Sequence, residues 1–364
     1  MTALETTTGA PFDLAPLLAP IPGEQPAGEW LRYDAAYDEL RKLREADDPS
    51  LPQGVWKREL KRADWNGLAT RAAATLSTRS KDLQIAVWLT EAWLHLRGFA
   101  GFAAGMRTIA ALCRDFWDTL YPPLEDGSAD GRLAPLVWAA DKLLFPLESL
   151  AVTSPAGEES APLSWADRGR ALYYQNLEES HPSEAAAAYR AGTATFAQFQ
   201  VSASLTPGEW YASLARDAVA ARAAIDEVEA ALAERAGAAD APSFTAIAGT
   251  LDAIGAFAAR IVAERVHGGE IEAPAGVDPD AFAAFAHDAV PIPAGTIASR
   301  AEAFQRLRDA ADFLFRTEPH SPVPYLVTRA ISWEHLPLPQ LLAELLQKNE
   351  LAAVYALLGM ESER

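Results

Sequence analysis

The sequence predicts an all-α protein, built from several helical bundles joined by Pro/Gly-rich linkers. Apolar residues recur with helical periodicity along most of the chain, alanine is abundant, and no run of alternating apolar and polar residues indicates a strand. Half of the 364 residues are hydrophobic, which is enough for real cores, and this length is typical of two or three domains.

A helix that is apolar around its whole circumference begins near Ser80. Its apolar residues are Leu83, Ile85, Val87, Trp88, Leu89, Trp93, Leu94 and Leu96. Because such a helix must be buried, we expect it at the centre of an N-terminal domain, residues 1–150. Three glycines follow. They are Gly98, Gly101 and Gly105. Glycines at a helix start can cradle a phosphate. The simpler interpretation is that these glycines end the buried helix and let the next helix approach closely.

Two further helices complete this domain. The first ends before Pro122 and Pro123, which cannot continue a helix. Its last apolar residues are Cys113, Phe116, Trp117, Leu120 and Tyr121. The second carries Val137, Leu143, Leu144 and Leu147.

A linker over 151–164, rich in Pro, Gly, Ser and Glu, precedes a middle helical domain over 165–266. Thr206 and Glu209 predict a capping box, with Pro207 at the first helical position and Gly237 as the C-cap. One face of this helix is apolar: Trp210, Leu214, Ala218, Ala221, Ile225, Val228 and Leu232. A short turn leads to a second helix, so the two are expected to be antiparallel neighbours; its apolar positions are Ile247, Leu251, Ile254, Ala258 and Ile261.

An acidic Pro/Gly linker over 267–295 leads to a C-terminal helical domain over 296–364. This domain is too short for a large core, so we expect it to oligomerise or to dock on a partner. Within this domain, residues 317–326 contain three prolines, Pro319, Pro322 and Pro324. These prolines should lie outside helices, so we expect the segment to be a stiff connector that orients the C-terminal helices.

The charge and cysteine content restrict the function. Fifty acidic residues against 31 basic ones give a formal charge of −19, which repels phosphate backbones and predicts no nucleic-acid partner. A single cysteine, Cys113, excludes a disulfide framework and fits a reducing cytoplasm. Residues 1–20 lack signal-peptide features, and no apolar run of about 18 residues is evident, so no direct membrane insertion is expected.

The sequence predicts no catalytic, cofactor-binding or metal-binding residue, and therefore no enzyme. It contains no phosphate-binding loop, dinucleotide fingerprint or nucleophile elbow. No two of the six histidines have metal-ligand spacing. Cys113 stands in an apolar helical run, which is typical of a buried structural thiol.

Two motifs leave alternatives open. The loop from Asp126 to Gly131 copies the first half of a calcium loop, but its twelfth position is Val137 instead of Glu, so we expect a solvated acidic loop. His320 beside Glu318 is either a general base or, as we prefer, a side chain that fixes the turn by bonding a loop carbonyl.

Three stretches resemble the TssA (ImpA-type) proteins of bacterial type VI secretion systems. The first is APIPGEQPAGEWLRY (19–33), in which Trp30 replaces an expected acidic residue. The second runs from RSKDLQ (79–84) through WLTE (88–91) to GFAG (98–101). The third is EPHSPVPYL (318–326), followed by Arg329, Ala330 and Trp333.

The resemblance implies a cytoplasmic structural assembly factor without cofactors, which forms a ring-like homo-oligomer. It implies the baseplate, tail tube, sheath and membrane-complex proteins as partners. The alternatives are a sheath-end cap protein of the same family, or a helical hydrolase built from carboxylates. The candidate structural or partner-docking residues are Arg79, Ser80, Lys81, Asp82, Glu318, Pro319, His320, Ser321, Pro322, Pro324 and Tyr325.

Overall fold

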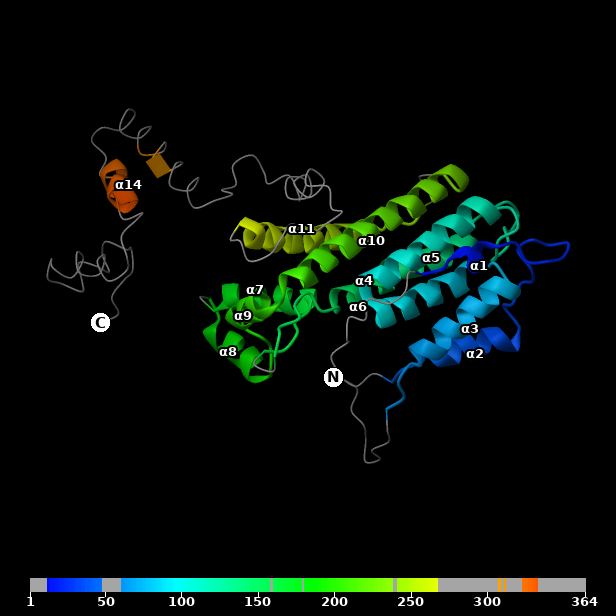
Figure 1. Ribbon diagram of the computed structural model, residues 1–364, viewed down its shortest axis with the longest axis horizontal. Helices are drawn as coiled ribbons and strands as arrows, with labels where there is room; N and C mark the ends of the chain where they lie inside the picture. The colour runs from blue at the N-terminus through cyan, green and yellow to red at the C-terminus, as the bar shows by residue number, and fades with distance from the viewer. Residues whose placement is uncertain are drawn as a thin grey trace. The chain divides into compact units, whose positions relative to one another are not determined.

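The computed structural model describes residues 12–47, 60–157, 160–178, 180–237 and 241–267, together with 307–308, 311 and 323–332. Within these ranges every regular element is a helix and there is no strand, which confirms the all-α prediction. The chain forms two compact units (Figure 1): helices α1 to α11 belong to the first, and α14 to the second.

The centre of the first unit is a tight helical hairpin. Helix α4, Leu83–Phe116, is interrupted by Gly98, whose φ of 58° lies in the left-handed region. A Cβ on Gly101 would lie 2.1 Å from the carbonyl oxygen of Trp93, and one on Gly105 would lie 2.4 Å from Thr90 Oγ1. These two pairs show that the halves of α4 run antiparallel in close contact. The prediction that the glycines end the buried helix and admit the next one is confirmed.

Five shorter helices pack in the same core as this hairpin. The helices α1 (Ala15–Leu18), α2 (Ala35–Arg44) and α3 (Trp65–Thr78) pack together, with α1 and α3 also against α4. The helices α5 (Asp130–Lys142) and α6 (Leu144–Glu148) follow α4 and also contact it.

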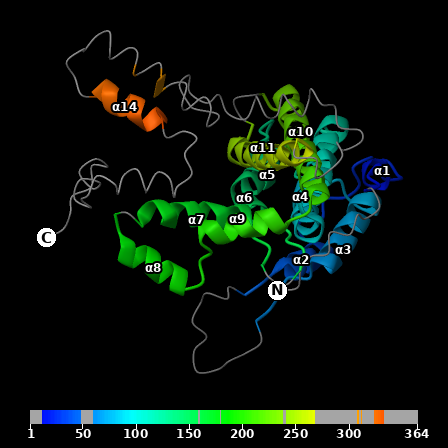
Figure 2. The same ribbon diagram turned by 60° about the vertical axis from the view of Figure 1, so that its left-hand side comes forward.

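Two long helices extend the same core. Helix α10, Gly208–Arg235, packs along α4, and α11, Thr245–His267, lies beside α10 (Figures 1 and 2). They are antiparallel, as predicted, because Arg222 Nε lies 3.5 Å from Asp252 Oδ2 and the rings of Tyr211 and Phe257 are 5.9 Å apart. The predicted apolar faces of both helices are largely buried. The segments before and after 151–164 thus share one core, and their division into two domains stays a prediction.

The predicted start of α10 is wrong. The helix begins at Gly208, and the Thr206 hydroxyl donates to the carbonyl of Ser202 and accepts from the backbone N–H of Ser154, both at 2.8 Å. No capping box forms, because the N-cap is Pro207, and the Thr206 hydroxyl instead bonds the end of α9, Phe196–Leu205, and the loop that contains Ser154. The C-cap prediction is confirmed, since Gly237 has a φ of 87°.

Helices α7 (Trp165–Leu177), α8 (Pro182–Arg190) and α9 form a smaller group, visible together in both ribbon views (Figures 1 and 2). Arg265 of α11 ties this group to the core by donating to the carbonyls of Ala203, Ser204 and Thr206. In the segment 151–164, which was expected to be a linker, the backbone N–H of Val152 donates to the carbonyl of Leu163 at 2.8 Å. A hydrogen bond therefore joins the two ends of this segment.

Among the described residues, one stretch, Thr245–Val266 of α11, is long and apolar enough to cross a membrane by length and composition alone. Its residues Ile247, Leu251 and Ile254 are buried in the core that α11 shares with α10, so its apolar character is accounted for by packing.

In the second unit, α14 spans Val323–Ser332, so the expectation that Pro324 lies outside any helix is also wrong. Pro324 stands in the first turn, where a backbone N–H has no intrahelical acceptor and its loss costs nothing. The candidates Glu318 to Pro322, most of linker 267–295 and most of the predicted C-terminal helices lie outside the described residues.

We expect Gly101→Ala to destabilise the protein by about 2 kcal/mol or more, because the new Cβ would overlap the Trp93 carbonyl and force the halves of α4 apart. Gly249→Ala is the matched control. This glycine also lies in a helix, but nothing stands within 4 Å of a Cβ there, so the change should be stabilising by up to about 1 kcal/mol. Urea denaturation measures both, and equal effects would contradict the tight hairpin.

Candidate functional site

The segment Arg79–Asp82 joins α3 to α4 and is hydrogen-bonded on both sides. On the side of the N-terminal loop, the backbone N–H of Lys81 donates to the carbonyl of Ala27 at 2.8 Å, and the backbone N–H of Glu29 donates to the carbonyl of Arg79 at 2.9 Å. Towards the turn after α4, Tyr121 N–H donates to Lys81 at 3.0 Å. This segment therefore connects three parts of the chain that are far apart in sequence.

Gly28 shows how close this contact is. Its φ is 74°, and a Cβ there would lie 2.0 Å from the carbonyl oxygen of Arg79. Glycine is required at this position for both its backbone conformation and its size. The Tyr121 hydroxyl closes the same contact by donating to the Gly28 carbonyl at 3.0 Å.

Lys81 is completely buried, and its ammonium group is hydrogen-bonded to backbone carbonyls. Nζ donates to the carbonyls of Leu17 and Leu76, both at 2.7 Å, and lies 5.6 Å from the centroid of the Phe116 ring. Both carbonyls belong to last turns of helices, α1 and α3, where a cation is favoured by the unsatisfied C=O groups. Burial lowers the pKa of this lysine to about 8. The side chain thus holds two helix ends together.

Asp82 is the N-cap of α4. Its Oδ1 accepts from the backbone N–H groups of Gln84 at 2.8 Å and Ile85 at 3.2 Å. The carboxyl is almost fully buried, and this burial raises its pKa to about 6, although the two N–H donors act in the opposite direction.

Arg79 is the member of this segment that reaches the surface. Its guanidinium pairs in bidentate fashion with Asp34, the N-cap of α2, at 3.2 and 3.0 Å. The hydrogen bond from Arg79 lowers the pKa of Asp34. Ser80 is buried, and its hydroxyl has no hydrogen-bond partner among the described residues. Hence Ser80, Lys81 and Asp82 are inaccessible to a partner in this conformation.

Arg132 is an internal clamp that was not predicted from the sequence. It donates to the carbonyls of Trp117, Leu120 and Pro122, the last two at 2.6 and 2.7 Å, and its Cζ lies 5.0 Å from the Trp117 ring. It thereby fixes the turn that receives Lys81. A signal existed, since Arg132 stands on the apolar face of α5, next to Leu133 and four residues before Leu136.

Two predictions about the remaining candidate motifs are confirmed. Cys113 is buried, and burial raises the pKa of its thiol to about 12, as expected for a structural residue. Of the predicted loop Asp126–Gly131, residues 126–129 lie between α4 and α5 and are mostly exposed, while Asp130 and Gly131 begin α5. Among the described residues, no three His, Cys, Asp or Glu side chains gather as a metal site requires. The candidates Pro324 and Tyr325 lie in α14, in the second unit.

These features define an all-helical protein in its described part, and its most distinctive charged residues make internal contacts. Residues 18–141 match the model of the ImpA N-terminal family of type VI secretion systems. The type VI secretion system component TssA1 of Pseudomonas aeruginosa is 30% identical over 335 residues, covering 88% of this chain and 90% of that protein. The chain belongs to the TssA (ImpA-type) family of type VI secretion system components.

A solved structure supports the same assignment. The N-terminal domain of TssA from Burkholderia cenocepacia, which includes the conserved ImpA_N region, matches with a TM-score of 0.62 and 29% identity. The match covers 73% of this chain and 98% of that domain.

Asp82→Asn should stabilise the protein in a pH-dependent way. Asparagine keeps the capping oxygen but never ionises. Asp82 has an ordinary pKa of 3.8, and burial raises it to about 6 in the folded protein, so the wild type loses stability as the pH rises from 3.8 to about 6. The gain in free energy of unfolding should be small at pH 4 and reach on the order of 3 kcal/mol above pH 7. Urea denaturation at pH 4, 5, 6 and 7 measures it. A difference independent of pH would contradict this assignment.

Arg132→Met should destabilise the protein by about 3 kcal/mol or more, because three buried carbonyls lose their donor. Arg114→Met is the control, since Arg114 is exposed and its side chain pairs with neighbouring Asp115; we expect little change. Thermal and urea denaturation compare the two, and a mild effect at Arg132 would mean that the turn is held by other contacts.

Proposed function

We propose that this protein is a cytoplasmic structural assembly factor of a type VI secretion system. It coordinates the baseplate with the tail tube and sheath through a ring-like homo-oligomer. The extent of the similarity to TssA1 supports this most strongly. The similarity covers 88% of the 364 residues, which is more than the 289 residues of the first compact unit, so it cannot be confined to that unit.

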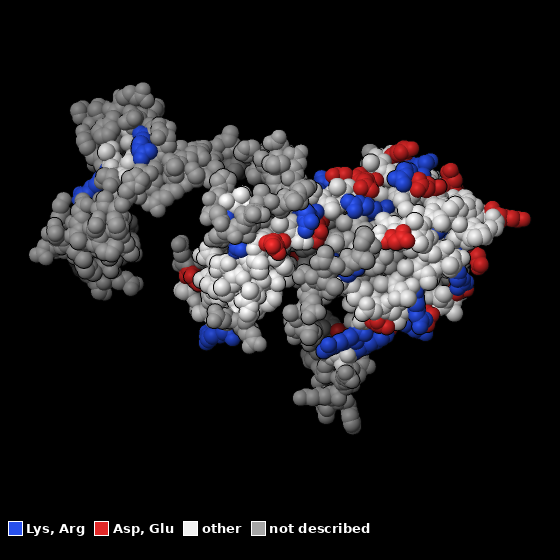
Figure 3. All heavy atoms as spheres, viewed as in Figure 1, with Lys and Arg blue, Asp and Glu red and all other residues white. Residues whose placement is uncertain are grey.

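The arrangement of the polar groups supports a role without catalysis. The buried groups that could perform chemistry serve internal contacts: Lys81 binds helix ends, Asp82 caps α4, and Glu91 pairs with Arg44. Among the described residues on the face drawn in Figure 3, blue and red side chains are interspersed and form no continuous basic surface. Such a surface suits protein partners better than nucleic acid.

In this proposal the chain works through several contacts at once. Residues 296–364 oligomerise, residues 1–150 and 165–266 present partner-binding surfaces, and residues 267–295 give them reach. A ring of identical subunits makes several weak contacts to one assembly, so their combined affinity exceeds each single one through effective concentration. The partners are baseplate, tube, sheath and membrane-complex proteins.

Size-exclusion chromatography with light scattering should give a mass several times 39.1 kDa for the full chain, and a monomer after deletion of residues 296–364. The tagged full chain should co-purify with baseplate, tube and sheath proteins of the same bacterium. Binding to sheath and membrane-complex proteins without the baseplate would instead identify a sheath-end protein. A monomeric full chain that binds none of them would refute the proposal.

A further inference from the structure

The loop before α2 exposes two large aromatic side chains. Tyr33 is 91% exposed and Trp30 is 41% exposed, and their rings meet edge to face with centroids 6.0 Å apart. Tryptophan and tyrosine dominate the binding energy of protein interfaces, since they offer a large contact area for few rotatable bonds. An exposed pair of this kind is a natural anchor for a partner.

The backbone that carries this pair is fixed from beneath. Ala27, before the exposed pair, and Leu31, between its two members, are both buried. The Glu29 N–H donates to Arg79 at 2.9 Å, and the bidentate pair between Arg79 and Asp34 closes the loop at its other end. Because the backbone is already ordered, a partner loses little affinity to ordering it.

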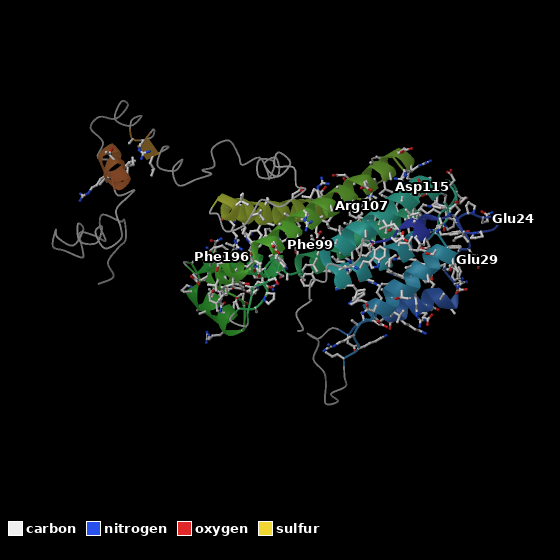
Figure 4. All side chains as sticks on the ribbon, viewed as in Figure 1. Glu24, Glu29, Phe99, Arg107, Asp115 and Phe196 are labelled. Atoms are coloured by element: carbon white, nitrogen blue, oxygen red, sulfur yellow. The ribbon has the colours of Figure 1, made fainter. Side chains whose placement is uncertain are left out.

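The charges around the pair favour a basic partner. Arg32 is directed to α2, where it donates to the Tyr37 hydroxyl at 3.1 Å and lies 5.6 Å from that ring. Arg79 is engaged by Asp34. Glu29 is three-quarters exposed, and its contact to Arg79 is long, at 3.9 Å. Figure 4 shows Glu29 at the same end of the first unit as Glu24.

We propose that Trp30, Tyr33 and Glu29 form a docking site for a basic segment of a partner protein. A lysine or arginine side chain would lie over the exposed aromatic faces, with its charge near the Glu29 carboxylate. The formal charge of −19 attracts such a segment from a distance. The inference rests on the proposed function for one point, that the partner is a protein of the secretion system.

Isothermal titration calorimetry of the full chain against purified baseplate, tube, sheath and membrane-complex proteins tests this site. Tyr33→Ala should weaken at least one of these interactions about tenfold, and the Trp30→Ala/Tyr33→Ala double variant should weaken it further. Glu29→Lys should weaken the same interaction. The affinity of the wild type for this partner should decrease as the salt concentration is raised from 50 to 200 mM. The decrease should be smaller for Glu29→Gln. Phe145→Ala is the matched control, because Phe145 is 68% exposed on α6, and it should bind like wild type.

The outcomes separate the site from the general function. Wild type that binds a partner while Tyr33→Ala and the double variant bind equally well would overturn the docking site and leave the proposed function intact. Wild type that binds none of the proteins would overturn both. Lost self-association with unchanged partner binding would make a second copy of this chain the occupant, and would also overturn the proposal. Because Tyr33 is almost fully exposed, Tyr33→Ala should keep the wild-type melting temperature, and this single variant decides if the double variant does not fold.

Discussion

The ammonium of Lys81, held between the carbonyls of Leu17 and Leu76, is the contact on which the first unit depends. A buried lysine is costly unless its donors are satisfied, and here the acceptors are the free carbonyls at the ends of α1 and α3. The position of Lys81 fixes the backbone of its neighbours. That backbone receives the N-terminal loop on one side and the turn after α4 on the other.

The proposed docking surface depends on this internal contact. The same segment that buries Lys81 and Asp82 places Arg79 against Asp34, and so fixes the loop that exposes Trp30 and Tyr33. Ser80, Lys81 and Asp82 are buried, and together with Arg79 they hold the loop that carries the proposed docking site.

Sequence reasoning predicted the parts of this fold that follow from periodicity. The buried hairpin helix, the antiparallel pair α10 and α11, and the Gly237 cap all follow from local patterns. The predicted Thr206 capping box is wrong because the N-cap of α10 is Pro207, and the Thr206 hydroxyl bonds Ser202 and Ser154 instead. The Arg79–Asp82 segment was identified by resemblance, but its burial was not, because nothing local to the segment shows that Leu17 and Tyr121 would meet it. The position of Arg132 on the apolar face of α5 indicates burial, but its acceptors could not be predicted, because they are backbone carbonyls that no sequence pattern distinguishes.

Hydrogen exchange measured by mass spectrometry on the full chain tests the central claim, by comparing wild type with Lys81→Met. In wild type, the amides of Glu29, Lys81, Leu83 and Tyr121 should exchange as slowly as the core of α4. In the variant, the segments that contain these four amides should all exchange faster. The reason is that the Lys81 side chain holds the N-terminal loop, the Arg79–Asp82 segment and the turn after α4 together. Unchanged slow exchange of these segments in Lys81→Met would show that the N-terminal loop is held by other contacts, and would contradict the account.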